Sequence, residues 1–470
     1  MRFSPILKAS LQHSPESAFS NTALHRGAAS QEPCVNAFLE ELSWRGLLHS
    51  TTSEDLAVHL ATPGRVAYCG FDPTAKALTI GNYLPIKMLA HWQRAGHRPL
   101  ALMGGATGLI GDPSGKSEER KLLGRDEVEA NISNYRTTFE RLLDFDPATS
   151  NRAGIVNNHD WLGGIGYIQM LRDVGKHFSV NMMIQKESVS ARLTEREQGI
   201  SYTEFSYMIL QAYDFLHLNR TMECTVQIGG SDQYGNIVAG IDLIRRLVGR
   251  EDPQSPDDEG RAYGVTNPLV TKSDGGKIGK SEKGAIWLDP EKTSPYAFYQ
   301  FWLNTTDSDV IKFLKWFTFE SRECIEDLER SATEAPQARE AQRALAESMT
   351  GLIHGETECD RARSASKALF SGAVRELDRK LLSEVFADVP ASSLSLANLQ
   401  ADELDLISLL PETSLASSKR ESRQFLEQGA VSVNGEKVDL QRHLKTADLL
   451  HGDTVLLRRG KKSWHALKFE

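Results

Sequence analysis

The chain has 470 residues, 40% of them hydrophobic and 25% charged, with a formal net charge of −9. These values fit a soluble protein of two or three domains and exclude a surface devoted as a whole to nucleic acid. No run of about 18 apolar residues occurs, which excludes a membrane-spanning helix. Residues 411–470 carry a net charge of +3 and the rest carries −12, so a polyanion is expected to dock at the C-terminal end.

Residues 1–34 differ from the rest of the chain. They are rich in Ser and Ala and poor in acidic residues, as in an organellar transit peptide. Because Pro5 and Pro15 interrupt an amphipathic helix, a disordered extension is an equal alternative. We expect a cytoplasmic protein, or a mitochondrial or plastid one if residues 1–34 are a transit peptide.

The cysteine pattern predicts no structural metal site. The number is odd and no CxxC pair occurs, which fits a reducing compartment without structural zinc. The cysteines are Cys34, Cys69, Cys224, Cys324 and Cys359.

The N-terminal elements begin with a helix predicted over Val35–Leu48 from apolar residues at helical spacing. The stretch YCGFDPTAKALTIGN (68–82) then predicts a strand that Pro73 ends, a tight loop and a helix from Ile80. A helix N-terminus that follows a strand binds phosphate readily. Taken alone, the stretch also fits an ordinary strand-to-helix connection.

A second strand, Pro99–Met103, enters the glycine-rich loop GGATGLIGDPSGKSEER. Such a loop lets the backbone approach a ligand closely, and Lys116 and Arg120 can meet phosphate. The spacing is not that of a Walker A loop, and a long surface loop is the alternative. A helix over Arg125–Leu143, a strand over Gly154–Asn157 and a helix over Trp161–Arg172 are predicted next.

The helix predicted over Phe205–Leu216 carries a polar stripe. Tyr207, Gln211 and Asp214 fall at i, i+4 and i+7, which places them on one face. Such a stripe faces water or lines a pocket, and its three different hydrogen-bonding groups suit recognition of a small polar molecule.

Another strand, helix and strand are predicted over Thr225–Ile228, Ile237–Leu247 and Pro268–Thr271, with the loop GGSDQYGN after the first strand. Strands alternating with helices predict a parallel, doubly wound α/β sheet. The following loop TKSDGGKIGKSEKG carries lysines that suit closure over phosphates, with a basic hairpin tip as the alternative.

The C-terminal part changes character. Ser294 to about Phe370 is helical in pattern, residues 372–410 are weakly patterned, and residues 411–470 predict a small α/β module. Two basic clusters in this module favour contact with an RNA backbone, with a solvated surface as the alternative. The clusters are Lys419, Arg420 and Arg423 on a helix, and Arg458, Arg459, Lys461 and Lys462 near a turn.

Five motifs occur in one order: GFDPTAxxLxIGN, GGATGLIGDPSGK, FSYMILQAYDF, QIGGSDQYGN and KIGKS. In this order they resemble the tyrosyl-tRNA synthetases of the bacterial type, which are class I aminoacyl-tRNA synthetases, from about Asn36 to the end. The resemblance implies that tyrosine and ATP form tyrosyl-adenylate and diphosphate, and that the tyrosyl group passes to the 3′ end of tRNA(Tyr). It also implies a homodimer, and Mg²⁺ carried by the ATP phosphates.

The same resemblance divides the chain into domains. A Rossmann-like catalytic domain would span 35–290, an α-helical anticodon-side domain 291–371, a linker 372–410 and an RNA-binding domain of ribosomal-protein type 411–470.

The matching motifs imply a role for each polar residue in tyrosine binding. Tyr68 and Asp214 would bind the phenolic hydroxyl, which is sensible because a carboxylate accepts a proton and a tyrosine both donates and accepts. The ammonium group would meet Asp112, Tyr207 and Gln211, and Gln233 would lie near the carboxylate.

The motifs also imply an ATP site. The adenosine and its ribose would meet Cys69, Asp72, Gly81, Asn82 and Asp232. The β- and γ-phosphates would meet Thr74, Lys277, Lys280 and Ser281, with Lys116 and Arg120 in support.

The family's HIGH motif departs from its usual form here, because it contains Thr79 and Asn82 in place of the two histidines. The first histidine would support the leaving diphosphate, and loss of such a donor costs about 3 kcal/mol. Since a threonine hydroxyl still donates, we expect a smaller loss.

Two other functions compete with this prediction. A tryptophanyl-tRNA synthetase is disfavoured because indole has no hydroxyl to match Tyr68 and Asp214. A non-catalytic RNA-binding or splicing-accessory relative would be marked by Thr79. Four retained residues argue instead for an active enzyme: Lys277, Lys280, Gln211 and Gln233.

Overall fold

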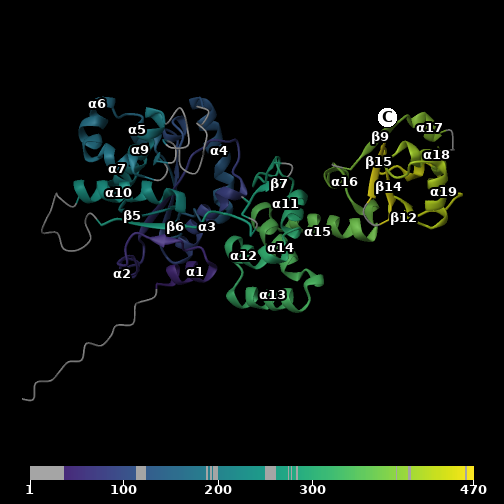
Figure 1. Cartoon of the computed structure of the whole chain (residues 1–470), viewed down its shortest axis with the longest axis horizontal. Helices are drawn as coiled ribbons and strands as arrows, with labels where there is room; N and C mark the ends of the chain where they lie inside the picture. Colours follow the sequence, from purple (N-terminus) through teal and green to yellow (C-terminus); the bar gives the residue numbers. More distant parts are fainter. Residues whose placement is uncertain are drawn as a thin grey trace, which may run out of the picture. The chain divides into compact units, whose positions relative to one another are not determined.

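The computed structural model describes residues 36–112, 123–186, 189–190, 193, 200–248, 261–273, 275–276, 278–281, 284–387, 389–400, 404–460 and 463–470. Figure 1 shows the chain coloured along its sequence, with labels on the helices and on some of the strands. Every helix within these ranges is too short or too polar to span a lipid bilayer.

A six-stranded sheet organises the N-terminal part, with strand order β1-β6-β5-β2-β3-β4. From β6 to β4 all neighbouring strands are parallel, and β1 runs antiparallel to β6. The predicted doubly wound, Rossmann-like sheet is thereby confirmed. The strands are Ser50–Thr51 (β1), Val66–Phe71 (β2), Arg98–Met103 (β3), Gly154–Asn157 (β4), Cys224–Gly230 (β5) and Tyr263–Asn267 (β6).

Helices cover both faces of this sheet. Successive side chains of a strand point to opposite sides, and in β2 both sets are apolar and need to be buried. Ala67 and Cys69 of β2 belong to the core that contains α3, whereas Val66 and Tyr68 pack with α9 and α10. The helices are α1 (Ala37–Arg45), α2 (Leu56–His59), α3 (Ile80–Arg94), α4 (Arg125–Leu142), α5 (His159–Leu162), α6 (Tyr167–Gln169), α7 (Val180–Ile184), α9 (Tyr202–Met222) and α10 (Tyr234–Leu247).

The order of the strands reverses next to β2. The chain places β3 and then β4 on one side of β2, and later places β5 and then β6 on the other side. The carboxyl ends of β2 and β5 therefore lie beside each other at the point where ligands bind in such sheets.

A helical part follows a small hairpin of β7 (Lys280–Ser281) and β8 (Gly284–Ala285). Its core is rich in aromatic side chains, with Trp302 in ring contact with Phe298, Phe313 and Phe317. The helices are α11 (Pro295–Leu303), α12 (Asp307–Phe317), α13 (Arg322–Glu334), α14 (Glu340–His354) and α15 (Glu356–Ser371).

The C-terminal part is built on a five-stranded sheet of order β12-β11-β14-β15-β9. Ser418 caps the basic helix α19, and Asn434 and Gly435 turn the hairpin between β11 and β12 with positive φ angles. The elements are α16 (Arg379–Val385), β9 (Ala391–Leu394), α17 (Leu396–Gln400), β10 (Leu404–Asp405), α18 (Leu406–Leu409), α19 (Lys419–Glu427), β11 (Val431–Val433), β12 (Glu436–Lys437), β13 (His443–Leu444), β14 (Thr454–Arg459) and β15 (Ser463–Phe469).

Two expected elements of the α/β part are wrong. The helix predicted over Trp161–Arg172 is interrupted after α5, because Gly163 and Gly164 break the helical run before α6. No strand forms over Pro268–Thr271. The strand ends at Asn267 instead, since Pro268 cannot donate a hydrogen bond to a ladder.

Residues 372–410 were expected to be a linker with some helix, and they do contain the helices α16, α17 and α18. They also contain two strands, which were not expected, and β9 pairs in parallel with β15 at the edge of the C-terminal sheet. A pairing with a partner so distant along the chain leaves no periodic signal in the segment itself.

Candidate functional site

A cavity of about 600 Å³ opens at the carboxyl ends of β2 and β5, where the strand order reverses. Every residue predicted to bind tyrosine or ATP whose side chain the structure describes lines this cavity. These residues are Tyr68, Cys69, Asp72, Thr74, Thr79, Gly81, Asn82, Asp112, Tyr207, Gln211, Asp214, Asp232 and Gln233.

Tyr68 lies at the buried end of the cavity and is fully shielded from solvent. Its hydroxyl has no hydrogen-bond partner among the described residues. Burial, and next the charge of Asp214, raise the pKa of this phenol well above its ordinary value, so the hydroxyl stays neutral. A buried polar group without a partner costs about 1–3 kcal/mol, which a bound ligand with a matching group would relieve.

Asp214 is only 2% exposed and is held by two residues that the sequence did not single out. Trp161 donates its indole N–H to Oδ1 (2.7 Å), and Asn158 donates to Oδ2 (3.0 Å). Burial raises the pKa of Asp214 to about 7, although both hydrogen bonds act to lower it. The carboxyl group is therefore fixed in orientation and titrates near neutral pH.

The same asparagine connects Asp214 to Asp72. Asn158 also donates to Thr107 Oγ1 (3.0 Å), and Thr107 donates to Asp72 Oδ1 (2.8 Å). The hydroxyl of Tyr207 donates to the other oxygen of Asp72 (2.9 Å). A continuous polar network thus joins the loops after β2, β3 and β4 with helix α9.

A second polar group lies on the β5 side of the cavity. Gln233 Nε2 donates to Asp112 Oδ2 (2.8 Å), and Gln211 Nε2 donates to Gln233 Oε1 (3.2 Å). Asn236, on helix α10, donates to Gln211 Oε1 (3.0 Å) and Gln233 Oε1 (3.2 Å). The acceptor of one residue is thereby matched to the donor of the next, which fixes which way each amide points.

The two unusual residues of the HIGH motif pair with each other at the start of α3. The backbone N–H and the hydroxyl of Thr79 both donate to Asn82 Oδ1, at 3.0 and 2.9 Å. Because this oxygen is occupied, the amide NH₂ of Asn82 is the end of the side chain that is left to meet a ligand. Thr74 and Asp232 are exposed in the cavity, whereas the thiol of Cys69 is buried, which raises its pKa to about 12.

The KIGKS motif lies against the same helix N-terminus. A methyl group on Gly279, which has φ +80°, would come within 2.3 Å of Ile80 Cγ2. The N–H of Ile286 donates to Gly279 O (2.8 Å), and the N–H of Ile80 donates to Ile286 O (3.0 Å). Lys277, Lys116 and Arg120 lie outside the described residues, as do the side chains of Lys280 and Ser281.

The predicted RNA-binding clusters separate into two kinds. The side chains of Lys419, Arg420 and Arg423 are exposed on α19. Arg458 instead donates to Leu369 O (3.3 Å) and lies over the ring of Trp464, and Arg459 donates to Leu415 O (2.7 Å). These two arginines therefore have intramolecular partners that the sequence did not indicate; Lys461 and Lys462 lie outside the described residues.

Two protein-family models match the chain and together span most of it. The model described as "tRNA synthetases class I (W and Y)" matches residues 63–371, more than half of the chain. The model described as "Tyrosine--tRNA ligase SYY-like C-terminal domain" matches residues 382–467.

Individual proteins give the same result. A tyrosine–tRNA ligase of Staphylococcus epidermidis is 50% identical over 438 residues, which are 93% of this chain and 100% of the relative. That of Staphylococcus saprophyticus subsp. saprophyticus is 49% identical with the same coverage. Among solved structures, a C-terminally truncated mitochondrial tyrosyl-tRNA synthetase of Aspergillus nidulans has 32% identity and a TM-score of 0.62, covering 71% of this chain and 94% of that chain.

Proposed function

Because this chain belongs to the tyrosine–tRNA ligases of the class I tRNA synthetase family, we propose that its cavity carries out tyrosine activation by direct displacement on ATP. A carboxylate oxygen of tyrosine attacks the α-phosphorus, the bond to the bridging oxygen breaks, and diphosphate leaves with the electron pair. The tyrosyl group then passes to the 3′ end of tRNA(Tyr). The cavity offers glycine-lined turns and amide donors, which suit positioning and charge stabilisation.

The phenolic hydroxyl of the substrate is recognised by Tyr68 and Asp214. The observation that carries this assignment is the buried hydroxyl of Tyr68, which lacks a partner among the described residues and is close enough to Asp214 for its pKa to respond to that charge. Sites built to bind a hydroxyl reject the analogue that lacks it by about 10⁴- to 10⁵-fold, a range known from this enzyme class itself.

The ammonium and carboxylate groups of tyrosine are held by the polar side chains on the β5 side of the cavity. Asp112, Tyr207 and Gln211 bind the ammonium group, and Gln233 lies near the carboxylate. Their mutual hydrogen bonds supply the support for this role, because a polar site that is already oriented loses little entropy when its ligand binds.

ATP is held at the start of α3 and by the loops around it. Cys69, Asp72, Gly81, Asn82 and Asp232 meet the nucleoside, and Thr74 meets the phosphates together with Lys277, Lys280 and Ser281, supported by Lys116 and Arg120. Asn82 donates through its NH₂. The hydroxyl of Thr79 donates to Asn82 Oδ1, so it must break this hydrogen bond before it can donate to the diphosphate. Mg²⁺ enters with ATP and is held mainly by phosphate oxygens and water.

Tyrosine-dependent exchange of labelled diphosphate into ATP tests this function. The purified chain is expected to exchange with tyrosine and to give a rate near the blank with phenylalanine or tryptophan. Exchange no faster than the blank with tyrosine would instead identify a non-catalytic RNA-binding relative, and preference for tryptophan would overturn the assignment of Tyr68 and Asp214.

The exposed cations of α19 are expected to bind the tRNA backbone. Replacing Lys419, Arg420 and Arg423 together by glutamine should reduce the slope of log K for tRNA(Tyr) against log salt by about 1 per lost phosphate contact. Diphosphate exchange, which needs no tRNA, should stay unchanged.

The matched control for this variant interchanges Lys and Arg at the same three positions, which keeps the charge and should keep the slope. Arg458 and Arg459 suit this test less, since their replacement would also remove contacts to Leu369 and Leu415. A tRNA affinity that does not change in the glutamine variant would contradict the RNA-binding role of α19.

Large apolar side chains on successive segments support a homodimer formed by a second copy of this chain. Tyr167 and Ile168 of α6 are 62% and 73% exposed, and Val180 and Met182 of α7 are 56% and 61% exposed. The hydroxyl of Tyr202, at the start of α9, lies 3.1 Å from that of Tyr167, so α9 extends the same surface. Exposed apolar surface of this extent marks an interaction site.

Replacing Ile168 by aspartate should therefore raise the dimer dissociation constant by roughly 30-fold or more, measured by analytical ultracentrifugation. A two-fold axis would place two such carboxylates in one interface. Val58→Asp on α2 is the matched control, because Val58 is 71% exposed outside this surface. Equal dissociation of both variants would remove α6 from the interface.

We place the enzyme in the cytoplasm, with an organelle as the alternative if residues 1–34 are a transit peptide. Mass spectrometry of the mature N-terminus distinguishes the two, because a transit peptide is removed.

A further inference from the structure

Lys87, on helix α3, is a fully buried lysine that the tyrosine and ATP sites do not use. Its ammonium group donates to the carbonyl oxygen of Thr318 and to that of Lys315 (3.3 Å). Burial lowers the pKa of Lys87 well below its ordinary value. A buried amine of this kind is tolerated only while its acceptors stay in place, so the position of these carbonyls is tied to α3.

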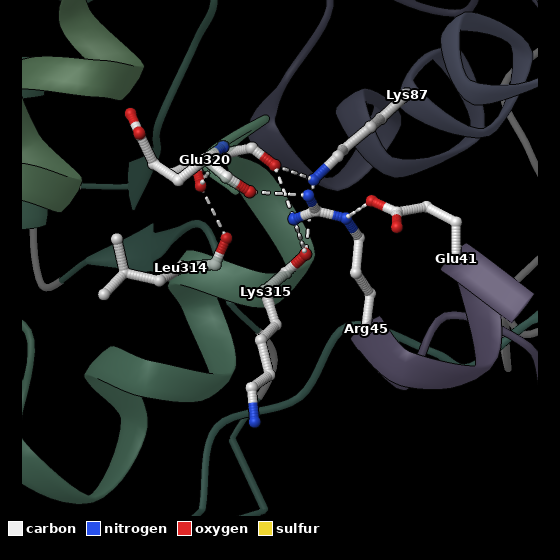
Figure 2. A network of polar contacts seen from close by, with 7 residues as sticks. Glu41, Arg45, Lys87, Leu314, Lys315 and Glu320 are labelled. Atoms are coloured by element: carbon white, nitrogen blue, oxygen red, sulfur yellow. Dashed lines mark hydrogen bonds and ion pairs between the residues drawn. The ribbon is translucent and has the colours of Figure 1, made fainter. Parts of the chain in front are cut away.

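Arg45, the last residue of α1, reaches the same carbonyls from another direction. It donates to Lys315 O (3.1 Å), Thr318 O (3.0 Å) and Glu320 O (2.7 Å), and its Nε pairs with Glu41 at 2.6 Å. Figure 2 shows Arg45 and Lys87 pointing from separate helices to the end of α12. Free carbonyls at a helix C-terminus carry a partial negative charge, which stabilises the two cations.

The whole inner face of α3 joins this contact. Tyr83 donates its hydroxyl to Phe317 O (2.6 Å), and the guanidinium of Arg94 lies 3.6 Å from the ring centre of Phe319. Tyr83 and Lys87 are four residues apart and therefore share one side of the helix. The segment after α12 is thus bound along the helix whose first turn lines the ATP cavity.

The other end of α12 is attached to the base of the KIGKS loop. Asp309 accepts a hydrogen bond from the N–H of Ser273 (2.9 Å), and Lys312 donates to Thr271 O (2.8 Å). The loop returns from this base, since the N–H of Ile278 donates to Val270 O (3.3 Å). One helix of 11 residues, about 16 Å long, therefore touches both structures that flank the triphosphate.

We propose that α12 sets the distance between the KIGKS loop and the start of α3. Lys87, which binds the C-terminal end of α12, and Lys312, which reaches the loop base from the middle of α12, are then positioning residues for ATP. This proposal rests on the proposed ATP site. It assigns no chemical step to either lysine. Their effect is mechanical, because a displacement of about 1 Å in a reacting group can cost roughly 100-fold in rate.

The test replaces each lysine by methionine, which keeps an unbranched side chain and removes the ammonium group. In diphosphate exchange by the full chain, Lys87→Met and Lys312→Met should each raise KM for ATP or lower kcat by roughly 3- to 30-fold. The dissociation constant for tyrosine should stay within twofold, because Asp214 is held by Asn158 and Trp161, which both lie outside α12. Lys312→Arg should restore most of the loss.

The double variant gives the decisive result. If α12 acts as one connecting element, losing the second lysine contact after the first adds little. The double variant should therefore show about the same loss in kcat/KM for ATP as the more impaired single variant. Effects that multiply, or equal losses of ATP use and tyrosine affinity, would overturn the proposal. No change in either single variant would overturn it as well.

Two controls separate positioning from folding and from the proposed function. Lys367→Met makes the same substitution at an exposed site on α15 and should leave exchange unchanged. Lys87→Met should not lower the Tm, since an apolar chain of similar volume removes the cost of burying the amine and Arg45 still donates to both carbonyls. If the unaltered chain gives no exchange, the proposed function fails; if it exchanges while the variants match it, only the role of α12 fails.

Discussion

Replacing Asp214 by alanine is expected to lower kcat/KM for tyrosine in diphosphate exchange by roughly 10³-fold or more, with little change for phenylalanine. The carboxylate is buried and fixed by Trp161 and Asn158, so its removal leaves the indole N–H of Trp161 without its acceptor and takes one of two acceptors from Asn158. Equilibrium binding of tyrosine and exchange kinetics with both amino acids measure the effect. Retained discrimination between tyrosine and phenylalanine would contradict the assignment.

Asp214→Asn is the matched variant, because it keeps the size of the side chain and removes the ionisation. With its pKa raised to about 7, Asp214 becomes an ionised acceptor as the pH rises through 7, so tyrosine affinity should increase over that range. The asparagine variant should bind weakly at every pH from 6 to 8. The stability contribution has the opposite sign, since a raised carboxyl pKa favours the folded state at low pH and this benefit is lost as the pH rises through 7.

Replacing Gly104 by alanine is expected to lower kcat/KM roughly 100-fold for both ATP and tyrosine, which is the second large effect. A methyl group at this position would lie 2.1 Å from Asp72 Oδ1 and 2.5 Å from Thr107 Oγ1. These atoms are hydrogen-bonded to each other at 2.8 Å, so the methyl group must separate them and displace the network that reaches Asp214 through Asn158. Exchange kinetics with each substrate varied in turn measure the loss.

Gly164→Ala is the control for this variant, because a methyl group there meets no atom within 4 Å. It should leave both KM values and kcat unchanged. A normal rate in Gly104→Ala would mean that the hydrogen bond between Thr107 and Asp72 is not needed for either substrate.

The strand, loop and helix around residues 66–94 could be predicted because each signal is local. The proline after Asp72 ends the strand, and apolar residues at helical spacing begin at Ile80, where α3 begins. The stripe of Tyr207, Gln211 and Asp214 was predictable for the same reason, since their spacing along the sequence places them on one face of α9. All three line the cavity.

The residues that hold this stripe in place were not predictable from such patterns. Asn158 and Trp161 follow β4 and reach Asp214 only because β4 lies in the same parallel sheet. A lone asparagine after a strand also fits a turn, so its sequence gives no reason to prefer a buried role. Asn236 is similar, because its partners are on another helix and in a loop.

The sequence alone determined the order of the elements, the class of sheet and the polar side chains that meet at one edge, because these follow from periodicity and from turn chemistry near each residue. Only the tertiary structure decided which polar groups are buried, which oxygen accepts from which donor, and that Lys87 and Lys312 link α12 to α3 and to the base of the KIGKS loop. Burial and pKa depend on atoms that distant segments bring together, and the exposed cations of α19 differ from Arg458 and Arg459 for that reason alone.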